Sequence, residues 1–230
     1  MCIRDSNTTV EEVLEVADRM LKKAPDAVIE RSFDEEPDSV VQSYTEQRLA
    51  VSLPLFMLGF KEPCRREDKS TEEVVEANLL LELIAGKTSP LYRRLMEQGL
   101  INDSFGTEYF EGSGYAASLF TGETRDPKAV RDEILREIVR LRETGIDSAA
   151  FERAKRRYYG RAVMSFNSVE NIANSLAACH FTGRSLFEES GCVARMTKQR
   201  LEQRLQDTLR DDQAVLSAIL PPENKGGNQK

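Results

Sequence analysis

The sequence predicts a mixed α and β domain in which blocks of strands and blocks of helices alternate. Several segments repeat apolar residues at the spacing of one helix face, directly after a capping residue. Other segments are short apolar runs, two of which flank the turn Gly112-Ser113-Gly114. The chain has 230 residues, 40% of them hydrophobic, and a chain of this length can bury roughly 70% of its unfolded surface. We therefore expect a folded protein of one large or two small domains.

The N-terminal part predicts one helix between two irregular segments. Thr8 and Glu11 have the spacing of a capping box, and apolar residues follow at helical spacing as far as about Lys23. Residues 1–7 have no such periodicity and join the helix abruptly, so we expect a truncated or artefactual start. Residues 24–39 contain prolines and an acidic stretch, which is typical of a connecting loop.

The rest of the chain alternates between extended and helical patterns. Val40–Val51 alternates imperfectly and Leu53–Phe60 is almost continuously apolar, which indicates an outer strand followed by a more central one. The helix from Ser70 to Gly86 carries apolar residues on more than one face, so we expect it to be the most deeply packed. The remaining predicted elements are a helix at Ser89–Gln98, strands at Ser104–Glu111 and Tyr115–Thr121, helices that start at Asp126, Asp147 and Ser168, a helix at Thr197–Leu209 and a strand at Ala214–Leu220. The polar tail, residues 223–230, should be disordered.

Charge and hydropathy argue against two classes of partner. The formal net charge of −7 offers no footprint for phosphate backbones, so we expect no nucleic acid partner. No apolar run approaches the roughly 20 residues that cross a bilayer, and there is no secretion signal, so we expect no membrane partner either. The basic residues between Arg153 and Arg161 could form an anion site, but the acidic surroundings favour a solvated or salt-bridged face.

Histidine and cysteine limit the possible chemistry. His180 is the only histidine, so a zinc site built on two or three imidazoles cannot be completed within this chain. We expect His180 to be a packing or hydrogen-bonding residue at the end of the apolar ladder of its helix. The four cysteines form no C-x-x-C pair, which favours free structural thiols in the cytoplasm. The chain also lacks the G-x-S-x-G, Walker, H-E-x-x-H and H-x-x-E-H motifs, so we predict no catalytic residue and no metal ligand.

The order of several motifs resembles one known family. The segments Thr88–Leu100, Ala150–Lys155 and Phe166–Asn174, in that order and with the predicted helices and strands around them, resemble the C-terminal domain of the pitrilysin/insulinase family of zinc metallopeptidases, in its bacterial, processing-peptidase-like branch. The resemblance covers about Thr8 to Leu220, so residues 8–222 are expected to form one such domain.

This resemblance implies a fold and a role. It implies an α+β fold with a mainly antiparallel sheet and helices packed on one face, opposite a partner half across an enclosed chamber. The N-terminal half of the family carries H-x-x-E-H, so zinc is expected in a missing N-terminal half and no cofactor in this chain. The implied function is the non-catalytic half of a zinc endopeptidase, inactive alone, which forms the chamber wall and contacts peptide substrates. The alternative is a non-catalytic interaction or regulatory subunit that partners a separate, homologous peptidase chain.

The resemblance also implies substrate contacts, and here the sequence departs from the family. Family members often carry an arginine and a tyrosine after the short helix, but the arginine position holds Met96 and Gly99–Asp103 contains no tyrosine. Tyr109 and Phe110 on the following strand are the best substitutes as substrate-binding residues, with ordinary aromatic packing on a sheet as the other interpretation. A strand should also precede the first helix in this fold, so a truncated start would leave an open sheet edge and a tendency to associate.

Overall fold

A computed structural model describes residues 8–22, 37–63, 69–112 and 114–222. The expectations for residues 1–7 and 223–230, and most of the predicted loop at 24–39, lie outside these residues. The described elements, in chain order, are α1 (Val10–Met20), β1 (Tyr44–Arg48), β2 (Leu55–Lys61), α2 (Thr71–Ala85), α3 (Pro90–Glu97), β3 (Gly106–Gly112), β4 (Tyr115–Glu123), α4 (Pro127–Thr144), α5 (Ser148–Ser165), α6 (Val169–Thr182), α7 (Glu188–Arg195), α8 (Lys198–Asp207) and β5 (Ala214–Leu220).

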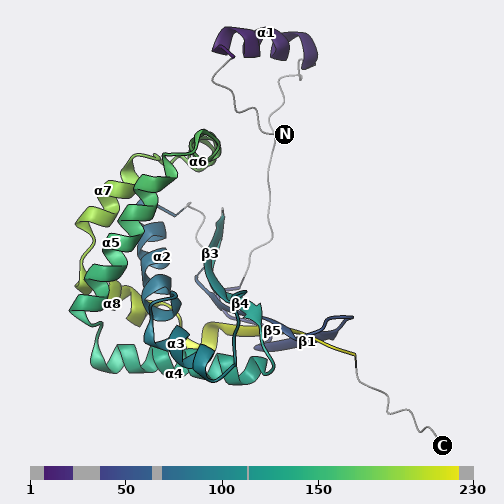
Figure 1. Cartoon of the computed structure of the whole chain (residues 1–230), viewed down its shortest axis with the longest axis vertical. Helices are drawn as coiled ribbons and strands as arrows, with labels where there is room; N and C mark the ends of the chain where they lie inside the picture. Colours follow the sequence, from purple (N-terminus) through teal and green to yellow (C-terminus); the bar gives the residue numbers. More distant parts are fainter. Residues whose placement is uncertain (1–7, 23–36, 64–68, 113, 223–230) are drawn as a thin grey trace, which may run out of the picture.

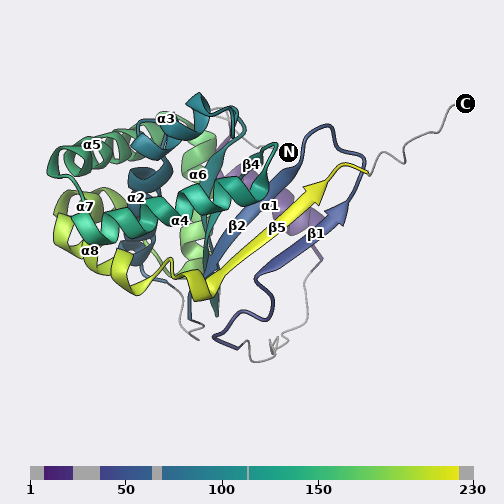
Figure 2. The same cartoon turned by 90° about the horizontal axis from the view of Figure 1, so that it is seen from below.

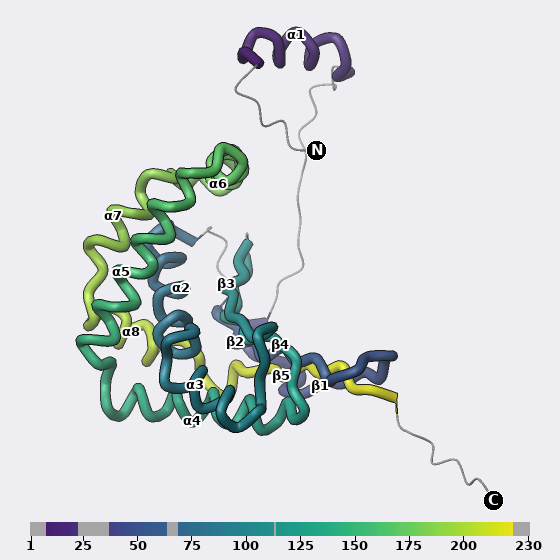
Figure 3. Tube along the Cα trace, viewed as in Figure 1, coloured from purple at the N-terminus to yellow at the C-terminus, as the bar shows by residue number. Residues whose placement is uncertain are grey.

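The strands form one five-stranded sheet in the order β1-β5-β2-β4-β3. β1 and β5 are parallel, and the other neighbouring pairs are antiparallel. The last strand therefore lies beside the first, although they come from opposite ends of the described chain (Figures 1 and 3). This sheet confirms the expected α+β fold, in which the antiparallel pairing dominates.

Helices cover one face of the sheet, and the other face is partly exposed among the described residues. On β2, Phe56, Leu58 and Phe60 alternate toward the helices and are buried. Helices α2 and α4 pack on that face of the sheet, and α8 packs on both of these helices (Figure 2). The residues between them point to the other face, where Met57 is 45% exposed. The apolar run of β2 is thus buried on one side and only partly covered on the other, among the described residues.

Helix α2 is the most deeply packed helix, as its sequence predicts. Eight of its residues are buried, and it contacts α3, α5, α7, α8 and β3. The predicted capping box is present, because the Ser70 side chain accepts from the backbone of Glu73 and the Glu73 side chain accepts from Ser70 N. The side chains of Asp126, Asp147 and Ser168 accept hydrogen bonds from backbone N–H groups at the starts of α4, α5 and α6 and so cap these helices.

Three details of the sequence prediction are wrong. The first helix is capped by Thr9 with Glu12, not by Thr8 with Glu11, since both pairs have the capping spacing and only the backbone decides between them. Strand β1 is shorter than Val40–Val51. Helix α7 was not expected, because its N-terminus has no side-chain cap and its sequence includes Gly191.

Most of the apolar residues of α1 and α6 are exposed in the described structure. Neither helix has a buried residue, although both carry apolar side chains at helical spacing. The prediction for His180 is also wrong: this residue is exposed, and its ring lies edge-on to Phe181 at a centroid distance of 5.7 Å. The ladder of α6 predicted a buried face, but the helix lies at one end of the helical layer (Figure 1).

Candidate functional site

Tyr109, one of the two predicted substrate-binding residues, lies in a buried ionic cluster. Its side chain points to the helix face of β3 and the residue is only 8% exposed. The hydroxyl donates a hydrogen bond to Glu62 Oε2 at 3.0 Å. Lys69 Nζ lies 3.1 Å from the same oxygen, and the Arg204 guanidinium lies 5.4 Å from the centre of the tyrosine ring. Arg204 also forms an ion pair with Glu62.

These surroundings keep the Tyr109 hydroxyl protonated. Burial raises its pKa, and the negative charge of Glu62 raises it further, against the opposing effect of Arg204. The neutral hydroxyl is therefore a donor, and its acceptor is Glu62. A role of Tyr109 in substrate binding stays a prediction, and its hydroxyl is engaged inside the domain.

Phe110 points to the opposite face of the sheet. It is 48% exposed, and its ring packs against Tyr115 across the β3–β4 hairpin with centroids 5.3 Å apart. The two predicted residues are thus adjacent in sequence but lie on different faces, because successive side chains of a strand alternate. Substrate binding by Phe110 also stays a prediction.

The segment that departs from the family pattern serves as a turn. Met96 lies near the end of α3 with an exposed side chain. Asn102 Oδ1 accepts from Ser104 N at 2.9 Å, while Asn102 Nδ2 donates to Glu123 at 2.8 Å. These bonds fix the connection from α3 to β3 against the end of β4.

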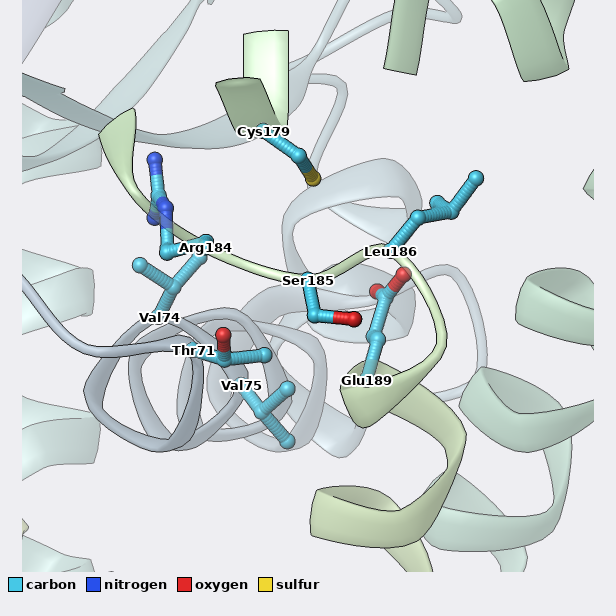
Figure 4. Close-up of a pocket in the computed structure, with 8 residues that line it drawn as sticks. All are labelled: Thr71, Val74, Val75, Cys179, Arg184, Ser185, Leu186 and Glu189. Carbon is cyan, nitrogen blue, oxygen red and sulfur yellow. The ribbon is translucent and has the colours of Figure 1, made fainter. Parts of the chain in front are cut away.

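A small cavity lies near the end of β3, because one of its lining residues, Arg184, pairs with Glu111 of that strand. Figure 4 shows the residues that line the cavity. Its volume is about 150 Å³. Its walls are mainly apolar and come from the start of α2, from α6 and from the turn before α7. The residues that line it are Thr71, Val74, Val75, Cys179, Arg184, Ser185, Leu186 and Glu189.

Two hydrogen-bonded pairs fix charges at this cavity. Arg184 pairs with Glu111 of β3 at 2.6 Å, and Glu189 accepts a hydrogen bond from Tyr158 at 3.0 Å. Cys179 contributes a free thiol to the wall (Figure 4). The neighbouring His180 is not among the lining residues and is exposed. The geometry therefore offers an apolar recess with fixed charges at its edge, and no pair of a nucleophile and a base.

Sequence reasoning missed this cavity. Its walls join residues about 110 positions apart in sequence, and none of them belongs to a motif. The one available signal was the capping box at the start of α2, which predicts where that helix begins but not which distant segments pack against it.

The residues do not fit a zinc site. Among the described residues, no three histidine, cysteine, aspartate or glutamate side chains are grouped so that they could hold a metal ion. The whole sequence contains a single histidine, whereas catalytic zinc in proteins is usually held by several imidazole or carboxylate ligands.

A family model described as the peptidase M16 inactive domain matches residues 5–158, more than half of the chain. The chain belongs to the peptidase M16 family, as its inactive domain. M16 is the pitrilysin family of zinc proteases, so the resemblance found in the sequence is confirmed.

Known proteins agree with this assignment. The M16 domain is 25% identical over 195 residues to the uncharacterized zinc protease YmfH of Bacillus subtilis, which covers 84% of this chain and 45% of that protein. A putative M16-like peptidase from Alicyclobacillus acidocaldarius is 27% identical, with a TM-score of 0.82 over 92% of this chain and 52% of the other. A protease from Helicobacter pylori shares the fold, at 18% identity and a TM-score of 0.76 over 93% of this chain and 53% of the other.

The chain spans about half the length of these relatives. Within the described residues, no helix of the M16 domain is both long and apolar enough to cross a membrane.

Proposed function

We propose that this M16 domain is the non-catalytic C-terminal half of a zinc-dependent endopeptidase. It forms part of the chamber wall and contacts peptide substrates, opposite an N-terminal half that holds the zinc and the H-x-x-E-H motif. The family assignment and the lack of zinc-binding groups among the described residues support this role. The free thiols of Cys179 and Cys192 support a cytoplasmic location.

The observation that carries the proposal is that apolar side chains are exposed on the outer face of the sheet and on α1. The outer face of the sheet presents Met57, Phe110 and Tyr115, all more than 40% exposed. Helix α1 presents Val10 and Leu14 on one stripe, and Leu21 directly follows the helix; all three are more than 50% exposed. An isolated helix of 11 residues is marginal in water, so α1 needs a surface to pack on. Apolar surfaces of this kind mark interaction sites, and a second M16 half is the partner that the family supplies.

The experiment is reconstitution. The chain and a separately produced half that carries H-x-x-E-H are assayed alone and mixed, with a quenched fluorescent peptide. We expect no hydrolysis by this chain and no stoichiometric zinc in it. The mixture should hydrolyse the peptide, and a zinc half with its motif glutamate changed to glutamine should form the same complex without activity. Stoichiometric zinc in this chain alone would contradict the proposal.

The same experiment separates the regulatory alternative. The fold also occurs, at 15% identity and a TM-score of 0.68, in a chain of Complex III2 from Candida albicans. This likeness is the reason to test whether the present chain is a subunit of a larger assembly. A subunit would bind a complete M16 peptidase and change its rate, but would not restore activity to an isolated zinc half.

A further inference from the structure

Helices α5 and α7 lie side by side and antiparallel, and a groove runs between them. Lys155 Nζ on α5 donates to Met196 O at the end of α7 at 2.8 Å. At the other end of the pair, the ring of Phe166 stacks on that of Phe187 with centroids 6.0 Å apart. Helix α2 packs against both helices from the inner side (Figure 1).

The middle of the groove has an apolar floor. It is lined by Tyr159 and Gly160 of α5 and by Val193 and Ala194 of α7, and its volume is about 360 Å³. A Cβ atom built on Gly160 would meet no atom within 4 Å. Glycine is less favourable than alanine inside a helix, and no described neighbour requires it here. The main effect of Gly160 is therefore a deeper groove.

Apolar side chains continue the groove toward the end of α5. Val163 lies one turn after Gly160 on the same face of the helix and is 49% exposed. Phe166 and Phe187 follow, at 37% and 70% exposure. From Arg156 to Phe166 the chain rises about 15 Å, or roughly three helical turns. A furrow of this length between two helices fits a third helix.

The basic residues of α5 divide into two groups. Arg157 and Arg161 form ion pairs with Glu82 at 2.5 and 2.8 Å, in agreement with the salt-bridged face that the sequence favoured. Arg153 and Arg156 are exposed and lie one turn apart. Their side chains form no hydrogen bond or ion pair with another described residue, so two guanidinium groups stay available at this end of the groove.

The other charges at this end leave an excess of positive charge. The ammonium of Lys155 is fixed beside α7 by its bond to Met196 O. Glu152 also lines the groove, but within the described structure no ion pair joins it to Arg156. With Arg153, this end carries three cations and one carboxylate, although the chain as a whole has a net charge of −7. Acidic groups on a partner would complement it.

We infer that the groove between α5 and α7 docks an amphipathic helix of another protein, with its apolar stripe on the groove floor and its acidic residues beside Arg153 and Arg156. Charge complementarity specifies the acidic end, and the length of the groove specifies about three turns. The surface belongs to the helical layer, whereas the proposed function assigns the zinc-bearing half to the outer face of the sheet. The inference therefore goes beyond that function.

The test measures binding of a fluorescein-labelled model helix to the chain by fluorescence anisotropy at low salt. The model helix carries leucines at i, i+3, i+4 and i+7 and glutamates in its first turns. A helix with lysine in place of each glutamate should bind at least tenfold more weakly, and so should a peptide of the same composition with its leucines scrambled off the stripe. Added salt should weaken binding, because the paired charges are exposed.

The charge contact is tested by reversing one cation. Arg156→Glu should weaken binding of the glutamate helix at least tenfold and strengthen binding of the lysine helix. Arg93→Glu makes the same charge change at an exposed position of α3 and should bind both helices as the wild type does.

Gly160→Leu separates docking from stability. Leucine favours a helix more than glycine does, so the thermal midpoint should not fall. The leucine side chain fills the groove, however, and should weaken binding of the glutamate helix at least tenfold. Asp132→Leu, at an exposed position of α4, is the control and should leave binding unchanged.

Four outcomes would overturn the inference. They are no measurable binding, equal binding of the scrambled peptide, unchanged binding by both Arg156→Glu and Gly160→Leu, and self-association of the chain that Arg156→Glu abolishes. The last outcome would assign the groove to the acidic helix α1 of a second copy. If circular dichroism shows that Gly160→Leu does not fold, Arg156→Glu and the scrambled peptide still decide.

Discussion

The hydroxyl of Tyr109 on β3 donates to the carboxylate of Glu62, which directly follows β2, at 3.0 Å. These two strands are not neighbours, because β4 lies between them. The bond, together with Lys69 and Arg204 on the same carboxylate, therefore ties the edge strand to the interior of the domain.

Loss of the Glu62 carboxylate should destabilise the domain more than loss of the Tyr109 hydroxyl. Tyr109→Phe removes one hydrogen bond to a charged acceptor, which costs about 2 kcal/mol. Glu62→Ala leaves the nearly buried Lys69 without its partner and leaves Arg204 only its longer ion pair with Glu76 at 3.7 Å, which costs about 3–5 kcal/mol. Urea unfolding measures both. Glu108→Gln, on the exposed face of β3, is the control and should stay within about 0.5 kcal/mol of the wild type.

The stability of the domain should fall at alkaline pH through Tyr109. Its pKa is raised in the folded state above the ordinary value of 10.0, so the folded state retains the proton more strongly than the unfolded state. The stabilisation is complete below pH 10.0 and is lost as pH rises above that value toward the folded pKa. Tyr109→Phe should remove this part of the pH dependence, while Tyr115→Phe, at an exposed ring, should not. Equal alkaline slopes in the wild type and Tyr109→Phe would contradict the prediction.

Glu137 on α4 should contribute stability that acid removes. The residue is 2% exposed and accepts from Arg94 at 3.0 Å and Arg140 at 2.6 Å. Burial alone would raise its pKa, but these two arginines lower it below the ordinary 4.5. The contribution is therefore present above pH 4.5 and lost as pH falls through the lowered folded pKa.

Glu137→Gln tests this directly by urea unfolding over a pH series. The variant should lose about 2 kcal/mol near neutral pH, and the difference from the wild type should shrink in acid. A difference that is constant with pH would show that packing, not charge, accounts for the loss.

Helix α4 offers a matched comparison of two aspartates, one at its N-cap and one inside the helix. Asp126 Oδ1 accepts from Lys128 N at 3.1 Å and Ala129 N at 3.0 Å, so Asp126→Ala should cost about 1 kcal/mol. Asp132 lies inside the same helix, and its side chain, which is 52% exposed, pairs with Arg131, so Asp132→Ala should cost less than about 0.5 kcal/mol. Equal thermal midpoints of the two variants would contradict the cap assignment.

A charge introduced on the exposed outer face of the sheet should weaken binding to the zinc-bearing half without preventing folding. Met57 lies on the outer face of β2 and is 45% exposed, so Met57→Lys should unfold within about 1 kcal/mol of the wild type. The same variant should weaken the complex with a zinc-bearing half at least tenfold, as measured by sedimentation. Val139→Lys, at an exposed position of α4 away from the sheet face, is the control.

Much of the fold was predictable because short sequence patterns mark where its helices begin. The Ser70–Glu73 box and Asp126 before Pro127 mark helix starts by chemistry that acts within four residues. The cluster around Tyr109 was not predictable, since Glu62 and Arg204 are 142 positions apart and only the assembled sheet brings them together. The exposure of His180 was missed for the same reason: a helical apolar pattern shows that a face exists but not whether this chain covers it.

The position of β5 has a consequence for how the protein is made. Residues 214–220 fill the gap between β1 and β2, and they follow the other four strands of the sheet in sequence. During synthesis, the central position of the sheet therefore stays empty until residues 214–220 have left the ribosomal exit tunnel. A premature stop before Ala214 would therefore leave two separated pieces of sheet, and we expect such products to be recognised by cellular proteases.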